Sequence, residues 1–288
     1  MTDLDEYREE RKQRAEEVKS WKTRPHGPTI AFIALAAFVA LGIGIFARRA
    51  SGAADNGTTL PSDIANVGFV VRGDIRGIRI LHAEKPFDLE LGNGPIHAEV
   101  PKDEWRVPAE RLLERELGRY PARFLRNIKV AGIVLMQDLH EGSQSIPSLP
   151  NVGGLLLLDV HSVESDLVRV LHHELWHFAD MTDDGRVSPD PSWEKLNPES
   201  FVYGSGGRSL RSSWAAKPAT DLPGFVSAYA TSGVEEDKAE VFAFVLARHD
   251  ILVKQMENDR VLQTKVQKLR TRVAELDPVA PDALGFPR

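Results

Sequence analysis

The sequence predicts an α+β domain, with a small mixed sheet and one helix that carries the candidate chemistry, preceded by one transmembrane helix. Three observations support this fold class. Positions 29–47 hold nineteen uncharged, mostly apolar residues, short apolar runs between glycine turns fill 67–160, and helical periodicity dominates from 163 onward. A chain of 288 residues is long enough for one large domain after such a segment.

The apolar run predicts a membrane anchor over residues 28–49, because nineteen residues at about 1.5 Å per residue span about 30 Å of hydrocarbon. Seven Lys and Arg residues precede the run, and only Arg48 and Arg49 closely follow it. This bias predicts a single-pass protein of the cell membrane with a cytoplasmic N-terminus and an extracytoplasmic domain. A cleaved signal peptide is the alternative, although the run is long for a signal core and ends in Arg-Arg.

The remaining segments follow from composition and periodicity. Residues 1–27 are a charged cytoplasmic tail, and residues 50–64 are small, polar and typical of a flexible stalk. The soluble domain is predicted over 65–250, and a C-terminal helix and tail over 251–288. Strands are predicted at 67–71, 78–81, 96–100, 128–136 and 152–160. Helices are predicted at 107–117, 163–179, 235–247 and 251–276, and a long loop at 181–224.

The C-terminal helix has an apolar stripe at spacings of four and three. Its members are Leu262, Val266, Leu269, Val273 and Leu276. The stripe covers only two heptads, so packing against the domain is favoured over a coiled coil, and self-association through this helix stays open.

Composition excludes several classes of function. The chain has no cysteine, which rules out disulfides, thiolate-ligated zinc, iron–sulfur clusters and thiol nucleophiles. Any metal must therefore bind to His, Asp or Glu. The net charge of -6, without a basic run interleaved with aromatic residues, predicts no nucleic-acid partner.

The predicted helix 163–179 contains the motif His173-Glu174-Leu175-Trp176-His177, an HExxH pattern. Spacing of four places both imidazoles on one helix face, close enough to bind a single ion. Glu174 lies beside them and can take a proton from a metal-bound water and pass it to a leaving amine. The competing interpretation is a helix that carries two histidines by coincidence.

Further acids supply candidate supporting groups. Asp180, three residues after His177, can accept a hydrogen bond from a ligand imidazole. Catalytic zinc needs a third protein ligand, and the acid cluster over 235–237, with Glu240 one turn later, can reach back to provide it. Favourable interaction with the helix dipole would explain the cluster without any metal, but explains Glu240 less well.

These residues resemble a known family. The segment HHELWHFAD, a Tyr some fifty residues later and a Glu seven positions after it in an EDxAExFA context are similar to the gluzincin metallopeptidases. Within them the likeness is to the anthrax lethal factor and Mlc titration factor type, and to uncharacterised zinc-binding peptidases with similar YGxGG and FVSxYA stretches. The resemblance is confined to about residues 165–247.

The resemblance implies a zincin-like fold, a zinc ion and a set of site residues. These are His173, His177 and Glu236 as zinc ligands, Glu174 as general base, Tyr229 as a transition-state hydrogen-bond donor and Glu240 as a carboxylate that contacts a zinc ligand. Glu235 stays open as the alternative third ligand. A metzincin would need Gly at position 180, where this chain has Asp180, and a deformylase-type site would need a cysteine.

The expected function is therefore a membrane-anchored zinc endopeptidase that acts on a protein or peptide substrate. A substrate strand is expected to pair with the exposed edge of the 152–160 strand, with the 181–224 loop as a wall of the cleft. The alternatives are a non-catalytic binding or scaffolding protein of the same fold at the membrane, and a peptidase held latent by its loop or tail.

Overall fold

The computed structural model describes residues 68–91, 94–182, 185, 189–204, 206–207 and 222–287. All of them belong to one compact unit that spans Gly44–Arg288. The predicted cytoplasmic tail, anchor and stalk lie outside the described residues. Among the residues that are described, no helix combines the length and hydropathy that crossing a membrane requires.

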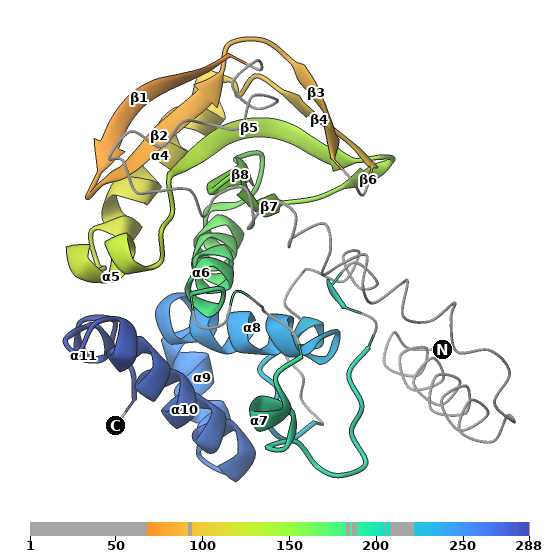
Figure 1. Cartoon of the computed structure of the whole chain (residues 1–288), viewed down its shortest axis with the longest axis vertical. Helices are drawn as coiled ribbons and strands as arrows, with labels where there is room; N and C mark the ends of the chain where they lie inside the picture. Colours follow the sequence, from red (N-terminus) through yellow and green to blue (C-terminus); the bar gives the residue numbers. More distant parts are fainter. Residues whose placement is uncertain are drawn as a thin grey trace, which may run out of the picture. The chain divides into compact units, whose positions relative to one another are not determined.

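The sheet has eight strands (Figure 1). They are β1 (Phe69–Ile75), β2 (Ile78–Ala83), β3 (Phe87–Leu91), β4 (Gly94–Glu99), β5 (Gly132–Glu141), β6 (Gln144–Ser145), β7 (Ser148–Val152) and β8 (Leu155–Asp159). The long β5 joins two parts of this sheet. Its first half pairs in parallel with β2 and β8, and its second half pairs antiparallel with β4 and β6. The sheet is therefore mixed, as predicted, but larger than the sequence indicated.

Each of the five predicted strand regions contains a strand, whereas β3, β6 and β7 were not predicted. The 152–160 strand needs a correction, because it is not an edge. Its core, β8, lies between β5 and the antiparallel β7, and its four leucines are completely buried. Among the described strands, the edge on this side of the sheet is β7.

The helices lie mostly on one side of the sheet and after it in the chain. They are α4 (Asp103–Leu117), α5 (Ala122–Asn127), α6 (Glu164–Asp180), α7 (Pro191–Glu194), the 3-10 turn η2 (Tyr229–Thr231), α8 (Val234–Ala247), α9 (His249–Met256), α10 (Arg260–Leu276) and α11 (Ala280–Ala283). The predicted single helix over 251–276 is two helices. Asp259 separates them, because its carboxylate accepts a hydrogen bond from the Leu262 amide at 2.9 Å and caps α10.

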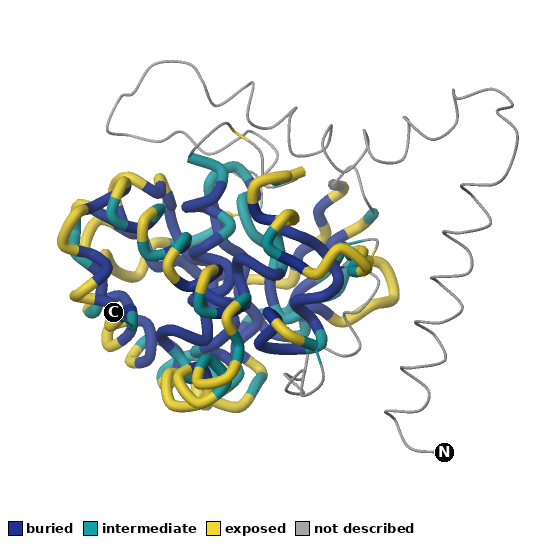
Figure 2. Tube along the Cα trace, turned by 90° about the horizontal axis from the view of Figure 1, so that it is seen from below, coloured by how far each residue is buried: buried dark blue, intermediate teal, exposed yellow. Residues whose placement is uncertain are grey.

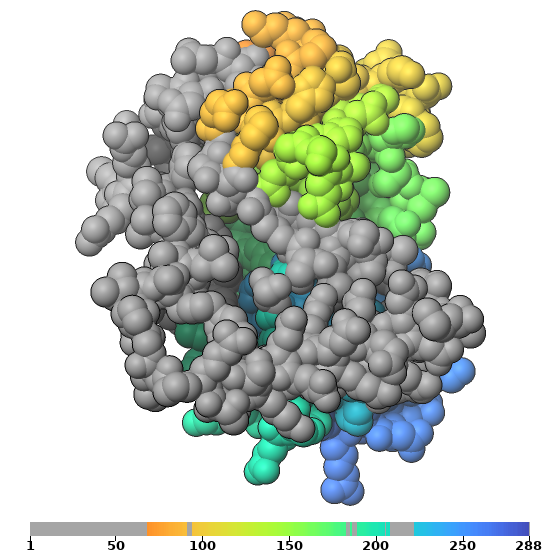
Figure 3. Space-filling view, turned by 90° about the vertical axis from the view of Figure 1, so that its right-hand side faces the viewer, coloured from red at the N-terminus to blue at the C-terminus, as the bar shows by residue number. Residues whose placement is uncertain are grey.

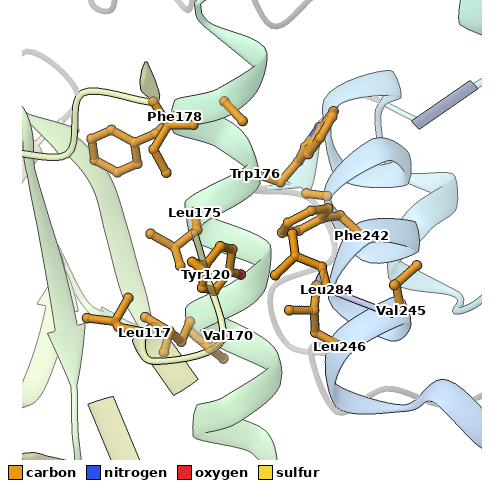
Figure 4. Packing of buried hydrophobic residues seen from close by; sticks show 14 of the residues in the cluster. Leu117, Tyr120, Val170, Leu175, Trp176, Phe178, Phe242, Val245, Leu246 and Leu284 are labelled. Carbon is orange, nitrogen blue, oxygen red and sulfur yellow. The ribbon is translucent and has the colours of Figure 1, made fainter. Parts of the chain in front are cut away.

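Helix α6 lies between the sheet and α8 (Figure 1). Leu175 and Phe178 pack on one side of it, while Trp176 faces Phe242 of α8, with ring centroids 5.0 Å apart (Figure 4). The face that carries the HExxH motif is buried as well, since His173 is 1% exposed and Val170 is 2% exposed. Figure 2 shows this buried interior in dark blue.

The C-terminal helices share the core of the domain. The five residues of the predicted α10 stripe are 0–7% exposed, so this apolar face is used within the chain. Self-association through the helix stays a prediction. On the face seen in Figure 3, the strands gather at one end of the domain and blue C-terminal residues at the other.

A buried charge also ties α10 to α8. The Lys265 ammonium, on a side chain with no exposed surface, lies 2.6 Å from Asp237 Oδ2 and donates to the Gly224 carbonyl at 2.7 Å. The same carboxylate oxygen accepts from the Trp193 indole and the Tyr203 hydroxyl. The first turn of α8 is thereby bound to the C-terminal helix and to the segment around α7.

We predict that Lys265→Met lowers the free energy of unfolding by about 3–5 kcal/mol, because it leaves the Asp237 carboxylate buried without its cation. Urea denaturation measures the change. Lys268→Met is the matched control, because this half-buried lysine of the same helix bonds only the exposed Ser192 hydroxyl among the described residues, and it should change stability by less than about 0.5 kcal/mol. Equal changes in the free energy of unfolding for the two substitutions would show that the buried Lys265–Asp237 pair contributes no more to stability than an exposed contact does.

Candidate metal centre

Three side chains from two helices converge where α6 meets the first turn of α8. His173 Nε2 lies 2.9 Å from Glu236 Oε2 and 3.1 Å from His177 Nε2, and His177 Nε2 lies 3.5 Å from the same carboxylate oxygen. Within the described part of the chain, this is the group of His and acidic side chains that could hold a metal ion. Glu236 therefore joins the two imidazoles, although it lies about sixty positions further along the chain.

The donor set fits a zinc ion. Two imidazole nitrogens and one carboxylate oxygen match the three protein ligands of catalytic zinc sites, in which a fourth position stays open. With metal–ligand bonds of about 2.0–2.1 Å, tetrahedral geometry separates neighbouring ligand atoms by about 3.3 Å. The separations of 2.9–3.5 Å observed here are close to that value.

The cluster is held together by charge. Burial alone would lower the pKa of His173, but hydrogen bonds to Glu236 and Glu240 outweigh it and raise this pKa to about 10. Burial alone would raise the pKa of Glu236, and the two imidazoles instead hold it well below its usual range. A metal ion must therefore displace a proton from the His173 side chain when it binds.

The other nitrogen of His173 is held by Glu240. Its Nδ1 donates to Glu240 Oε1 at 3.0 Å, which leaves Nε2 directed into the cluster. Arg169 donates to the same carboxylate oxygen at 2.5 Å, and Ser227 donates to Oε2 at 2.6 Å. Burial raises the pKa of Glu240, but Arg169, His173 and Ser227 outweigh burial and keep it below its usual value.

Arg169 and Ser227 were missed by sequence reasoning. The available signal for Arg169 was its place four residues before His173, on the same face of α6, where a guanidinium can serve as counter-ion to a buried acid. Ser227 carries no comparable signal, because the turn that brings it to Glu240 depends on the tertiary fold.

Asp180 makes a different contact from the one predicted. Its carboxylate pairs with Lys238 Nζ at 2.6 Å, and in the described residues no hydrogen bond joins it to either imidazole. His177 acts on Asp180 only electrostatically, by lowering the pKa of its carboxyl, while burial raises that pKa. Lys238 was not expected at the site, and its position on α8 explains why Asp180 turns toward it.

Tyr229 starts η2 and lies beside the cluster, with its ring centroid 5.8 Å from that of His173. Its hydroxyl borders Gly207 together with Glu236 Oε1, and a Cβ at position 207 would overlap both atoms. Two main-chain hydrogen bonds hold the glycine segment there. The Gly204 amide donates to the Thr231 carbonyl at 3.0 Å, and the Gly206 amide donates to the Ser232 carbonyl at 2.7 Å. Only glycine at 207 allows the backbone to approach the site so closely.

Glu174 lies on α6 between the two histidines and is 4% exposed. Its Oε1 accepts a hydrogen bond from Ser148 Oγ at 2.5 Å. Glu235, the alternative third ligand, lies outside the cluster, with its carboxylate against Gly206 and Gly233. The arrangement thus joins two imidazoles and the Glu236 carboxylate in one cluster, while the Glu174 carboxylate, next to His173 in the chain, contacts Ser148.

Comparison with known proteins adds a likeness of fold. No protein-family model and no curated protein matches the sequence. The chain is similar to a crystal structure from Bacteroides caccae described as a "putative zinc-binding metallo-peptidase", with 18% identity and a TM-score of 0.49 over 73% of this chain and 83% of that chain. The assignment of the site residues rests on the geometry given above.

We predict that Glu236→Ala weakens zinc binding by more than about 100-fold, because it removes one of three ligands, whereas Glu235→Ala leaves it within about threefold. Elemental analysis and competition titration with a chelator of known affinity measure both variants. Retention of zinc by Glu236→Ala with loss in Glu235→Ala would reverse the assignment.

Proposed function

We propose that the chain is a membrane-anchored, zinc-dependent endopeptidase of the gluzincin type. The observation that carries the proposal is the convergence of His173, His177 and Glu236, with Glu174 beside them on the helix. When bound, zinc would lower the pKa of a water molecule and polarise the scissile carbonyl. The other tasks of hydrolysis fall to side chains of this chain.

Glu174 is the proposed general base. It neighbours the ligand His173 in the chain, and its Oε2 is buried with no hydrogen-bond partner among the described residues. Such an oxygen is available to accept the proton of the attacking water and then to deliver it to the leaving amine.

Tyr229 is the proposed donor to the oxyanion. Its hydroxyl borders Gly207 on the side where Glu236 lies, and it would donate a hydrogen bond to the negative charge that develops on the carbonyl oxygen. A buried hydroxyl is suited to this task, because a donor that is already in place needs little reorganisation during the reaction.

An extended peptide substrate would bind to β7, in place of the 152–160 strand that the sequence indicated. β7 is an edge among the described strands and pairs with β8 on its other side. Edge strands bind extended peptides through main-chain hydrogen bonds. The contact between β7 and α6 brings such a peptide beside Glu174.

The membrane location of this activity rests on the sequence. The apolar run at 29–47 and the excess of Lys and Arg before it support a single-pass anchor with an extracytoplasmic catalytic domain. Protein or peptide substrates would then be met outside the cytoplasm.

We predict that Glu174→Gln keeps zinc but lowers kcat/KM by at least about 100-fold, because the amide cannot accept the proton. Cleavage of quenched fluorogenic peptides, with zinc content measured in the same samples, tests this. Glu164→Gln, an exposed change in the first turn of the same helix, is the control and should cleave at the wild-type rate.

Wild-type turnover by Glu174→Gln would show that another group is the base. A zinc-loaded wild type that cleaves no peptide would favour the alternative, a non-catalytic binding or scaffolding protein of this fold.

A further inference from the structure

Ser148 connects the edge strand to the proposed base. It is the first residue of β7, is 6% exposed, and donates its hydroxyl to Glu174 Oε1 at 2.5 Å. The two residues are 26 positions apart and lie in different elements, so the contact is a product of the tertiary fold.

The main-chain polar groups of Ser148 are directed away from β8. The Asp159 amide donates to the Pro147 carbonyl at 2.9 Å, so this carbonyl points toward β8. Ser148 is paired in register with Leu158, and main-chain groups alternate in direction along a strand. The N–H and C=O of Ser148 therefore point away from β8, toward the edge that no described strand occupies.

The hydrogen bond from Ser148 is the one that fixes the direction of the Glu174 carboxylate within the described residues. In the described part of the chain its Oε2 has no hydrogen-bond partner, and the Ser148 hydroxyl holds Oε1. A carboxylate on a side chain with three rotatable bonds adopts several directions unless a contact selects one, and proton transfer requires one direction. The hydroxyl supplies that selection without removing the second oxygen from use.

We propose that Ser148 is a positioning residue for the base, and that one residue serves both substrate and catalyst. Its main chain pairs with an extended peptide on β7, while its hydroxyl holds Glu174 in the direction that accepts the proton. This inference rests on the proposed peptidase function. It predicts that the hydroxyl contributes to kcat and contributes little to KM or to metal binding.

The test compares Ser148→Thr with Ser148→Val, because these β-branched side chains have nearly the same shape and differ in the hydroxyl. Ser148→Ala is measured beside them. We expect Val and Ala to lower kcat about tenfold, with KM within about twofold and zinc content equal to that of the wild type. Thr should restore kcat to within about threefold of the wild type. Ser145→Ala on the exposed β6 is the control and should leave all three quantities unchanged.

Equal kcat values for Thr and Val would overturn the proposal, and so would a loss confined to KM or to zinc content. A second measurement does not depend on activity. In metal-free protein, Ser148→Ala should shift the urea midpoint when Glu174 is present and shift it much less in a Glu174→Ala background. Additive shifts would overturn the contact itself. If the zinc-loaded wild type cleaves no peptide, the proposed function fails, and this cycle still decides whether Ser148 holds Glu174.

Discussion

The site depends on the contacts that two carboxylates on one face of α8 make with the His173 imidazole. Glu236 and Glu240 are four residues apart on α8, so their carboxylates lie on one side of the helix, one turn apart. They contact the two different nitrogens of the same imidazole, at 2.9 and 3.0 Å. These two contacts fix the rotation of the imidazole ring. They also fix the position of α6 relative to α8. The packing of Trp176 on Phe242 supports the same crossing with apolar contact.

The first two turns of α8 carry an unusual density of buried charge, and each charge has a partner on another element. Arg169 of α6 faces Glu240, Lys265 of α10 faces Asp237, and Lys238 faces Asp180. Burying an unpaired charge costs several kcal/mol. A displaced helix would leave such a charge buried without its partner. The ion pairs therefore favour one arrangement of the helices around the metal ligands, whatever their net contribution to stability.

The elements that could be predicted from the sequence are those that show in local periodicity. The HExxH helix and the α10 stripe follow from helical spacing, and a strand at β8 follows from its run of leucines, although its predicted place at the sheet edge was wrong. Glu236 came from family resemblance, because no local rule links an acid to an imidazole about sixty residues away. β7 was missed because Pro150 and Asn151 have low strand propensity, although an edge strand tolerates them.

Lys265 could not be recognised as buried, since a lysine within an apolar stripe is usually assigned to the solvent side. Asp180 shows the opposite error. Helical adjacency suggested an imidazole partner for it, and a lysine from another helix provided a stronger one.

The two functional contacts of α6 constrain each other. Successive residues on an α-helix are separated by about 100°, so His173 and Glu174 face different neighbours. The first is fixed by α8 through Glu236 and Glu240, and the second is fixed by β7 through Ser148. A rigid helix cannot rotate to improve one contact without breaking the other. The direction of the candidate metal ligands relative to the proposed base, Glu174, is thus set by the positions of β7 and α8 on either side of α6, which the packed core keeps constant.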